Sequence, residues 1–164
     1  MRRSAFMGIA AVAFVASNAF AQAKTSFAGT WNMVVDPAQQ QAAGAPGGGR
    51  GGRGGFGPTF TVTQDEKTLT IARTMGENTV SSVYNLDGSD SKNMMQGRGG
   101  AMEQISNAKW EGTNLVIITK VVRGEQTIEQ KRTLSLGADG VLTIETTQPG
   151  QDGNPMSTKV QYKK

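Results

Sequence analysis

Short apolar segments, each bounded by turn residues, are the feature that most constrains the fold of this chain. The clearest segment, 114–122, is rich in β-branched residues and lies between Gly112 and Gly124. Similar segments follow one another about every 10 to 13 residues, which is typical of an all-β sandwich or barrel. Alternation with a period of two, as in Phe60 and Val62, indicates strands with one buried face.

The pattern predicts about 8 to 10 strands joined by hairpin-length turns. The predicted strands are residues 29–36, 59–64, 68–74, 79–86, 91–96, 106–110, 114–122, 127–136, 141–147 and 157–163, of which 91–96 has the weakest pattern. Short turns pair each strand with its sequence neighbour, so we expect an antiparallel up-and-down meander. A meander removes its exposed edges by closing on itself, and we therefore favour a barrel over a sandwich. A barrel of this size is either filled by side chains or holds one small ligand.

Residues 1–23 have the form of a secretory signal peptide. A basic start at Arg2 and Arg3 precedes an apolar run over residues 5–16, and two small-x-small frames, Ala19–Ala21 and Ala21–Ala23, follow. The apolar run is too short for a membrane-spanning helix, which needs about 20 residues. We expect export to the periplasm or the medium, from a Gram-negative bacterium, as a single domain over residues 24–164 without a transmembrane segment.

Composition limits the chemistry that the chain can perform. Cys and His are both absent, which excludes disulfides, Cys/His zinc sites and imidazole-based catalytic triads. The formal net charge is +4, and removal of Arg2 and Arg3 with the leader lowers it to +2, so a nucleic-acid partner is not indicated. Acidic residues such as Asp65 and Asp87 fall at turns, where they accept local backbone hydrogen bonds. We expect no enzymatic activity and no cofactor.

The segment between the first two predicted strands breaks the strand pattern. Asp36, Pro37 and Gly44 suit the cap, first turn and end of a short helix. Residues 44–57 then form a Gly/Arg-rich stretch that we interpret as a flexible insertion. Its arginines resemble those of single-stranded RNA-binding tails, but in an exported chain a solvated loop is favoured. A second Arg/Gly patch lies at residues 96–100. As an alternative, the two Arg/Gly segments together form a weak binding site for an anionic surface.

Three methionines are the only metal candidates in the sequence. Met94, Met95 and Met102 offer thioether sulfurs, which suit Cu(I). Because no His or Cys adds affinity, we favour packing roles for these side chains and predict no metal site.

The Gly-Thr-Trp start at residues 29–31 resembles that of lipocalins and the wider calycin group. The whole chain is similar to small exported bacterial proteins of lipocalin-like type, which share this start, an Ala-Lys-Trp-x-Gly-x-x-Leu hairpin (here residues 108–115) and a Leu-Ser-x-x-x-Asp-Gly-x-Leu-Thr hairpin (here residues 134–143). The resemblance implies a lipocalin-like barrel in which Trp31 closes the base, with Gly29 before it and Trp110 as a second aromatic anchor. It also implies that the long loop after the first strand borders an open mouth, and that the function is ligand binding.

Strand alternation assigns candidate ligand-binding residues. Arg73 shares a face with the apolar Leu69 and Ile71 of its own strand, and Arg132 shares one with Leu134. Tyr84 and Tyr162 lie on apolar faces in the same way. An arginine inside an apolar barrel requires an anionic partner, because an unpaired buried charge is costly.

This arrangement is similar in chemistry to fatty-acid-binding barrels, which hold a carboxylate with an interior Arg and Tyr hydroxyls. We therefore predict a non-enzymatic barrel in which Arg73, Tyr84, Arg132 and Tyr162 bind a small apolar or amphipathic molecule, anionic where it meets the arginines. Two alternatives stay open: that both arginines point to solvent near the rim, and that the protein is an envelope module with a filled core and no ligand.

The signal-peptide hypothesis predicts the N-terminus of the exported protein. Mass spectrometry of the periplasmic or secreted form should find a chain that begins at Gln22 or Lys24, because a signal peptidase cleaves after small-x-small frames. Intact Met1 in a cytosolic fraction would contradict export.

Overall fold

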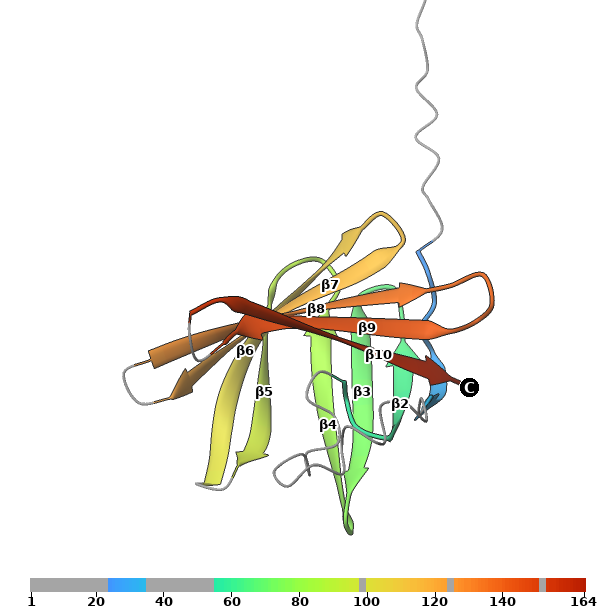
Figure 1. Cartoon of the computed structure of the whole chain (residues 1–164). Helices are drawn as coiled ribbons and strands as arrows, with labels where there is room; N and C mark the ends of the chain where they lie inside the picture. The colour runs from blue at the N-terminus through green and yellow to red at the C-terminus, as the bar shows by residue number, and fades with distance from the viewer. Residues whose placement is uncertain (1–23, 35–54, 98–99, 124–125, 151–152) are drawn as a thin grey trace, which may run out of the picture.

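The computed structural model of this chain describes residues 24–34, 55–97, 100–123, 126–150 and 153–164. These residues form one antiparallel sheet of ten strands and no helix (Figure 1). None of them belongs to a helix long and apolar enough to cross a membrane. The predicted signal peptide and the predicted helix after Asp36 lie outside the described residues.

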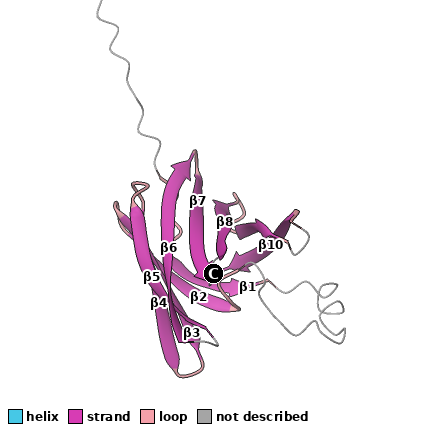
Figure 2. Ribbon diagram, turned by 90° about the vertical axis from the view of Figure 1, so that its left-hand side faces the viewer, coloured by secondary structure: helices cyan, strands magenta, loops and turns pink. Residues whose placement is uncertain are grey.

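The ten strands confirm the predicted meander. They are β1 (Gly29–Met33), β2 (Thr59–Gln64), β3 (Thr68–Met75), β4 (Asn78–Asn85), β5 (Asp90–Gly97), β6 (Gly100–Glu111), β7 (Asn114–Arg123), β8 (Gln126–Leu136), β9 (Leu142–Pro149) and β10 (Pro155–Lys163). Their order in the sheet is β4-β3-β2-β1-β10-β9-β8-β7-β6-β5. The first and last strands of the chain therefore pair in the middle of the sheet, and Figure 2 shows the sheet curling around its inner face.

Strand boundaries differ from the sequence prediction mainly at β1, β5 and β6. β1 ends at Met33 rather than at residue 36, and β6 begins at Gly100 rather than at residue 106. β5 is a full strand although its apolar pattern is weak, because its buried inner positions carry the polar side chains Ser91 and Asn93.

The prediction of a closed barrel is corrected at one seam. β4 and β5 stand at the two ends of the sheet order, and no main-chain ladder joins them. Polar side chains of β5 replace part of that ladder. The carboxamide of Asn93 accepts a hydrogen bond from Val83 N–H (2.7 Å) and donates one to Val83 C=O (2.9 Å), while Ser91 Oγ accepts one from Asn85 N–H (2.8 Å).

These bonds lie near the Leu86–Ser89 turn that connects the two strands, and the strands diverge with distance from the turn (Figure 1). We call this junction the β4–β5 seam. Side chains thus satisfy backbone groups that an open sheet edge would leave unpaired, and the sheet curls without closing its ladder.

Apolar side chains fill the inner face. Trp31, Phe60 and Leu134 are among the most deeply buried residues, with 0%, 1% and 0% of their surface exposed. The cluster also contains Phe27, Phe56, Val62, Leu69, Ile71, Tyr84, Leu86, Ala108, Leu115, Ile117, Leu142, Ile144 and Tyr162. Because the buried positions alternate along each strand, this core fixes which face of every strand points inward.

The seam generates a stability prediction. Asn93→Ala leaves the N–H and C=O of Val83 without their side-chain partner, so it should cost about 1–3 kcal/mol in the free energy of unfolding. Asn93→Asp should also destabilise at neutral pH, since a carboxylate cannot donate to Val83 C=O. Urea unfolding measures both effects. The control is Asn78→Ala at the exposed tip of the β3–β4 hairpin, which should change stability by no more than about 0.5 kcal/mol. An Asn93→Ala cost equal to that of the control would contradict the role of the seam.

Candidate functional site

Arg73 and Arg132 lie on the inner faces of their strands. In β3, Arg73 follows the buried Leu69 and Ile71 at intervals of two, and in β8, Arg132 precedes the buried Leu134 by two. Both arginines are half-buried. Their inner-face positions agree with the strand alternation, and their partial exposure leaves open the alternative in which both side chains reach solvent near the rim.

Arg132 is the centre of the candidate site. Its Nε atom is buried and has no hydrogen-bond partner among the described residues. Its guanidinium carbon lies 5.2 Å from the centroid of the Phe56 ring, a cation–π contact. Burial is the main influence on the group and lowers the pKa of Arg132, because a low-dielectric environment disfavours the charged form.

The groups whose charges act on Arg132 are the other three predicted site residues. Tyr84 and Tyr162 favour the charged form of Arg132, and Arg73 opposes it by like-charge repulsion, so the last of these lowers its pKa further. Arg73 and Tyr84 come from β3 and β4, whereas Arg132 and Tyr162 come from β8 and β10. The electrostatic influence of residues on β3, β4 and β10 on Arg132 of β8 indicates that the curl of the sheet turns these strands toward one another.

Among the described residues, no carboxylate compensates Arg132 and Arg73. Each of the ten acidic residues that the structure describes lies in a turn or on the outer face of a strand. The turn residues are Asp65, Glu66, Glu77, Asp87 and Asp139, and the outer residues are Asp90, Glu103, Glu111, Glu129 and Glu145. The salt bridges among the described residues, Lys92–Glu103, Lys109–Glu111 and Lys159–Glu145, are also on the outside. The inner face therefore carries two positive charges and, in the described chain, no negative one.

Tyr162 holds the segment before β2 against the core. Its hydroxyl donates to Gly57 C=O at 3.0 Å, and its ring meets Phe60 edge-on with centroids 4.9 Å apart. Burial raises the pKa of Tyr162, and a hydrogen bond from Phe56 N–H and the charge of Arg132 partly offset that rise. Because the Tyr162 hydroxyl is bonded to the backbone of both Gly57 and Phe56, it holds the Phe56 ring beside Arg132.

The predicted flexible insertion is corrected at its C-terminal end. Phe56 is 4% exposed and packs edge-on against Phe60 at 5.3 Å. A side chain at Gly55 would collide with the hydroxyl of Tyr162, so the chain passes there only because that residue is glycine. Residues 44–54 lie outside the described part of the chain. The sequence feature that could have predicted this contact is a single large apolar residue, Phe56, in a run of glycines. Its ring gains free energy when it is buried, whereas the neighbouring glycines have no side chain to bury.

Gly29, Trp31 and Trp110 form a separate group around Phe27. Trp31 Nε1 donates to Phe27 C=O at 2.8 Å, and the Phe27 ring stacks on Trp110 with centroids 5.8 Å apart. Lys164 Nζ lies 5.1 Å from the centroid of the Trp31 ring. The stem of Lys164 passes so close to Gly29 that a β-carbon there would collide with it. These residues pack together around Phe27 at one end of the core, and none of these contacts involves Arg132.

A row of neutral polar side chains borders the arginine site and was missed from sequence. Cross-strand pairing aligns Ser91, Ser106, Thr119 and Gln130 on the inner faces of β5 to β8. Gln130 Nε2 donates to Gln148 Oε1 on β9 at 3.0 Å, and Ser106 Oγ lies 3.0 Å from Thr119 Oγ1. We call these five residues the polar row. It lies two positions along each strand from the row that contains Ile117 and Arg132.

Half-buried apolar side chains lie beyond the polar row, on the side away from the core. Val121 and Ile128 pair across β7 and β8, and Met95 and Met102 pair across β5 and β6. We call these four residues the apolar rim. On β7 and β8 the inner face thus changes, from the core outward, from apolar to Arg132, to neutral polar and to apolar again. On β5 and β6 the row of Val121 and Ile128 continues in the polar Gln104 and Asn93, and apolar residues return only at Met95 and Met102.

The methionines do not assemble as one group. Met95 and Met102 are on the inner face, whereas Met94 is 56% exposed on the outer face. Met95 Sδ accepts a hydrogen bond from Gln104 Nε2 at 3.5 Å. Within the described chain, no three acidic side chains cluster in a way that could hold a metal ion.

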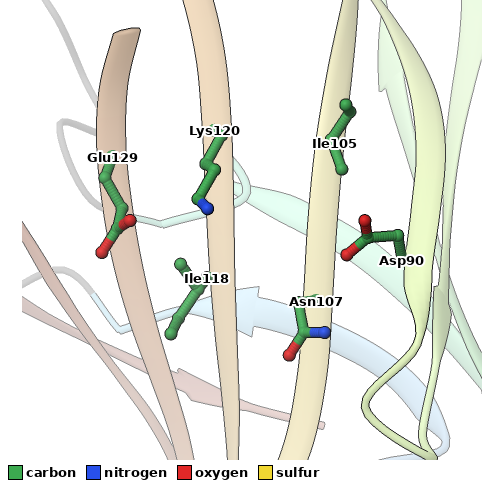
Figure 3. A pocket seen from close by; sticks show the side chains of 6 residues that line it. All are labelled: Asp90, Ile105, Asn107, Ile118, Lys120 and Glu129. Carbon is green, nitrogen blue, oxygen red and sulfur yellow. The ribbon is translucent and has the colours of Figure 1, made fainter.

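A hollow of about 410 Å³ lies on the outer face of β5 to β8 (Figure 3). It is lined by Asp90, Ile105, Asn107, Ile118, Lys120 and Glu129, none of which was predicted as a site residue. Its charged side chains are exposed, so water solvates them and no ligand is needed to compensate them. Two buried donors lack a partner among the described residues, the neutral Trp110 Nε1 and the charged Arg132 Nε, and we place the candidate site at Arg132 because an unpaired charge is the more costly to bury.

Comparison of the sequence with protein-family models and with curated proteins gave no match. The resemblance to lipocalins thus rests on the local motifs, and the candidate site rests on the geometry of this chain.

The uncompensated charge of Arg132 predicts the stability of the ligand-free protein. Arg132→Met should leave the free energy of unfolding unchanged or raise it, because replacing a buried charged group by a hydrophobe is often neutral or stabilising by about 1–4 kcal/mol. Lys131→Met, on the outer face of the same strand, is the matched control and should stay within about 0.5 kcal/mol of the wild type. Chemical unfolding of the two variants compares them directly. A loss of several kcal/mol for Arg132→Met alone would mean that the protein itself satisfies the guanidinium group.

Proposed function

We propose that this protein is a non-enzymatic binding protein for a small amphipathic anion. The observation that carries the proposal is the buried, unpartnered Nε of Arg132 beside Arg73, on an inner face that shows no carboxylate in the described chain. An anionic head group would supply the missing acceptor and compensate the charge, since charge-assisted hydrogen bonds from arginine are among the strongest in proteins.

The order of side chains along the inner face supports a head-inward orientation. The apolar core below Arg132 is filled by residues such as Leu134 and Ile144, so the head group takes the cationic level and not the base. The polar row would contact the part of the ligand next to the head group. The half-buried side chains of the apolar rim would contact the hydrocarbon tail and become more deeply buried on binding.

We further propose that the fold is a lipocalin-like meander whose ladder stays open between β4 and β5, and that the protein acts in the periplasm or outside the cell. The meander, Trp31 at the base and the hydrogen bonds across the β4–β5 seam support the first part. The sequence of residues 1–23 supports the second. Since the described acidic side chains lie in turns or on the outer face, binding at the inner face is consistent with capture of the ligand.

A structural or interaction module of the envelope is the second candidate. The observation in its favour is the completeness of the apolar core around Trp31, Phe27 and Leu115, all 0% exposed. A module of this kind would need no ligand, and the titration described next separates the two functions.

Isothermal titration with octanoate, below its micelle concentration, tests the binding function. Wild-type protein should show saturable binding, and Arg132→Met should weaken it by about 1.5–3 kcal/mol, the value of a hydrogen bond to a charged group. Tyr84→Phe should weaken binding less, because a neutral hydroxyl contributes only about 0.5–1.5 kcal/mol.

Two controls define the result. Octanol has the same tail without the charge and should bind more weakly than octanoate. Lys131→Met leaves the inner face intact and should bind octanoate like the wild type. Absence of saturable binding of any amphiphile, with circular dichroism showing intact β structure, would favour the envelope module instead.

A further inference from the structure

The edge of β4 that faces β5 has hydrogen-bond partners at one end and none at the other. Val83 directs both its N–H and its C=O to the carboxamide of Asn93, and the N–H of Asn85 also points away from β3. Residues of an antiparallel strand alternate between their two neighbours, so Ser81 and Thr79 direct their backbone groups the same way as Val83. Among the described residues, no hydrogen bond is formed on this side by Ser81 or Thr79.

The β4–β5 seam ends at this point because of the side chains that β5 carries. Its successive inner positions are Ser91, Asn93 and Met95. The first two bond the backbone of β4, whereas the thioether of Met95 has no hydrogen to donate and accepts from Gln104 Nε2. Beyond Asn93 the two strands diverge (Figure 1). The edge of β4 is therefore open, within the described chain, from Ser81 to the start of the strand.

The edge of β5 opens toward the same side. Asp90 C=O accepts a hydrogen bond from Asn85 Nδ2 at 3.0 Å, so Asp90 directs its backbone toward β4. By the same alternation, Lys92 and Met94 direct theirs toward β4. An extended chain that pairs with β4 here therefore has a second backbone neighbour in β5. A second copy of this protein that paired through its own β4 would carry its β3 to the side where β5 already lies, so the arrangement favours a single strand.

β4 also lacks the features that protect exposed sheet edges. Such edges are commonly guarded by lysine, proline, a bulge or short length. β4 is eight residues long, and its sequence, NTVSSVYN, contains no charged residue and no proline. On the outer face, Val83 and Met94 are 42% and 56% exposed on the two strands that the seam joins. An uncharged edge with exposed apolar side chains beside it is suited to pairing with an added strand.

The side chains beside the open edge indicate the chemistry of that strand. On the inner face, Val80 is half-buried and pairs directly with Arg73 on β3. A residue opposite Val80 on an added strand stands two strand spacings from Arg73, about 10 Å between backbones, which two long side chains span together. Among the described residues, the salt bridges do not include Arg73. A glutamate at this position would compensate the charge of Arg73, and β-branched neighbours would suit the rest of the strand.

We propose that the open edge of β4, from Thr79 to Ser81, binds an extended peptide segment of a partner protein by strand addition, and that this segment carries an acidic residue opposite Val80. The N–H and C=O groups of Ser81 and Thr79 fix the register of the segment. Arg73 supplies the preference for an acidic side chain. The inference goes beyond the proposed function and does not depend on a ligand at Arg132.

Amide hydrogen exchange and NMR titration of the wild-type protein test the proposal. Without peptide, the amides of Ser81 and Thr79 should exchange quickly with water, whereas that of Val83, bonded to Asn93, should exchange slowly. The probe is the peptide acetyl-Lys-Val-Thr-Glu-Thr-Val-Lys-amide. Its addition should shift the Ser81 and Thr79 amide signals in a saturable way and slow their exchange.

Modified peptides test whether the backbone of the probe is recognised. N-methylation of alternate residues removes the donors on one side of the strand, in either of two phases. Each phase should weaken binding about tenfold or more, because several hydrogen bonds are lost and both sides of the strand have a neighbour. Replacing the glutamate of the probe by glutamine should weaken binding about two- to fivefold, the range of a partly exposed ion pair.

Variants of the protein locate the contact. Ser81→Pro removes the N–H on the open side, where a strand edge accommodates proline, and should abolish detectable binding. Ser81→Ala keeps this N–H and is the matched control, which should bind the probe like the wild type. Arg73→Met should remove the difference between the glutamate and glutamine peptides and leave the binding of the glutamine peptide unchanged.

The opposite results would overturn the proposal. Slow exchange of Ser81 and Thr79 without peptide would mean that the edge is already covered, and sedimentation equilibrium would then distinguish a second copy from this chain itself. Binding that N-methylation does not weaken would exclude strand addition, as would a titration in which neither amide shifts. Equal binding of the glutamate and glutamine peptides would overturn the acidic preference alone. The measurements on the wild type decide the question even if Ser81→Pro does not fold, and they are independent of octanoate binding.

Discussion

The burial of the Arg132 guanidinium group on the inner face of a curled sheet is the constraint on which the site depends. Most of the inner face follows the ordinary rule of burial, with apolar side chains such as Leu134 and Ile144 excluding water. Arg132 departs from that rule because its Nε is buried without a partner. Departures of this kind cost stability and are expected where function requires them. The filled core at the base supplies the stability that allows the sheet to carry Arg73 and Arg132 on its inner face.

The β4–β5 seam connects the architecture to the site. A fully closed ladder would fix the distance between the wall that carries Arg73 and the wall that carries Arg132. Here the contact between the two sheet edges includes side chains, with Asn93 bonded to both backbone groups of Val83. Ser91 belongs both to the seam and to the polar row. The residues that hold the edges together are thus continuous with those that line the inner face.

Much of the fold follows from the sequence, because strand alternation is a local property. The ten-strand meander and the inward orientation of Arg73 and Arg132 could be predicted from periodicity alone. Closure could not, because β5 has polar residues at its buried positions and joins β4 through side chains. Contacts between distant strands depend on register, which local pattern does not fix. For that reason the polar row, formed by residues that each resemble ordinary strand residues, was missed, as was the packing of Phe56 at the end of a glycine-rich stretch.

The most direct test of this account is the side-chain NMR signal of Arg132. Its Nε–Hε correlation, assigned by its loss in Arg132→Met, reports whether that proton has an acceptor. On titration with octanoate the account predicts a downfield shift of Hε and slower exchange with water, as the buried donor acquires a charged acceptor. An unchanged Arg132 signal in a titration that shows saturable binding elsewhere on the protein would contradict it.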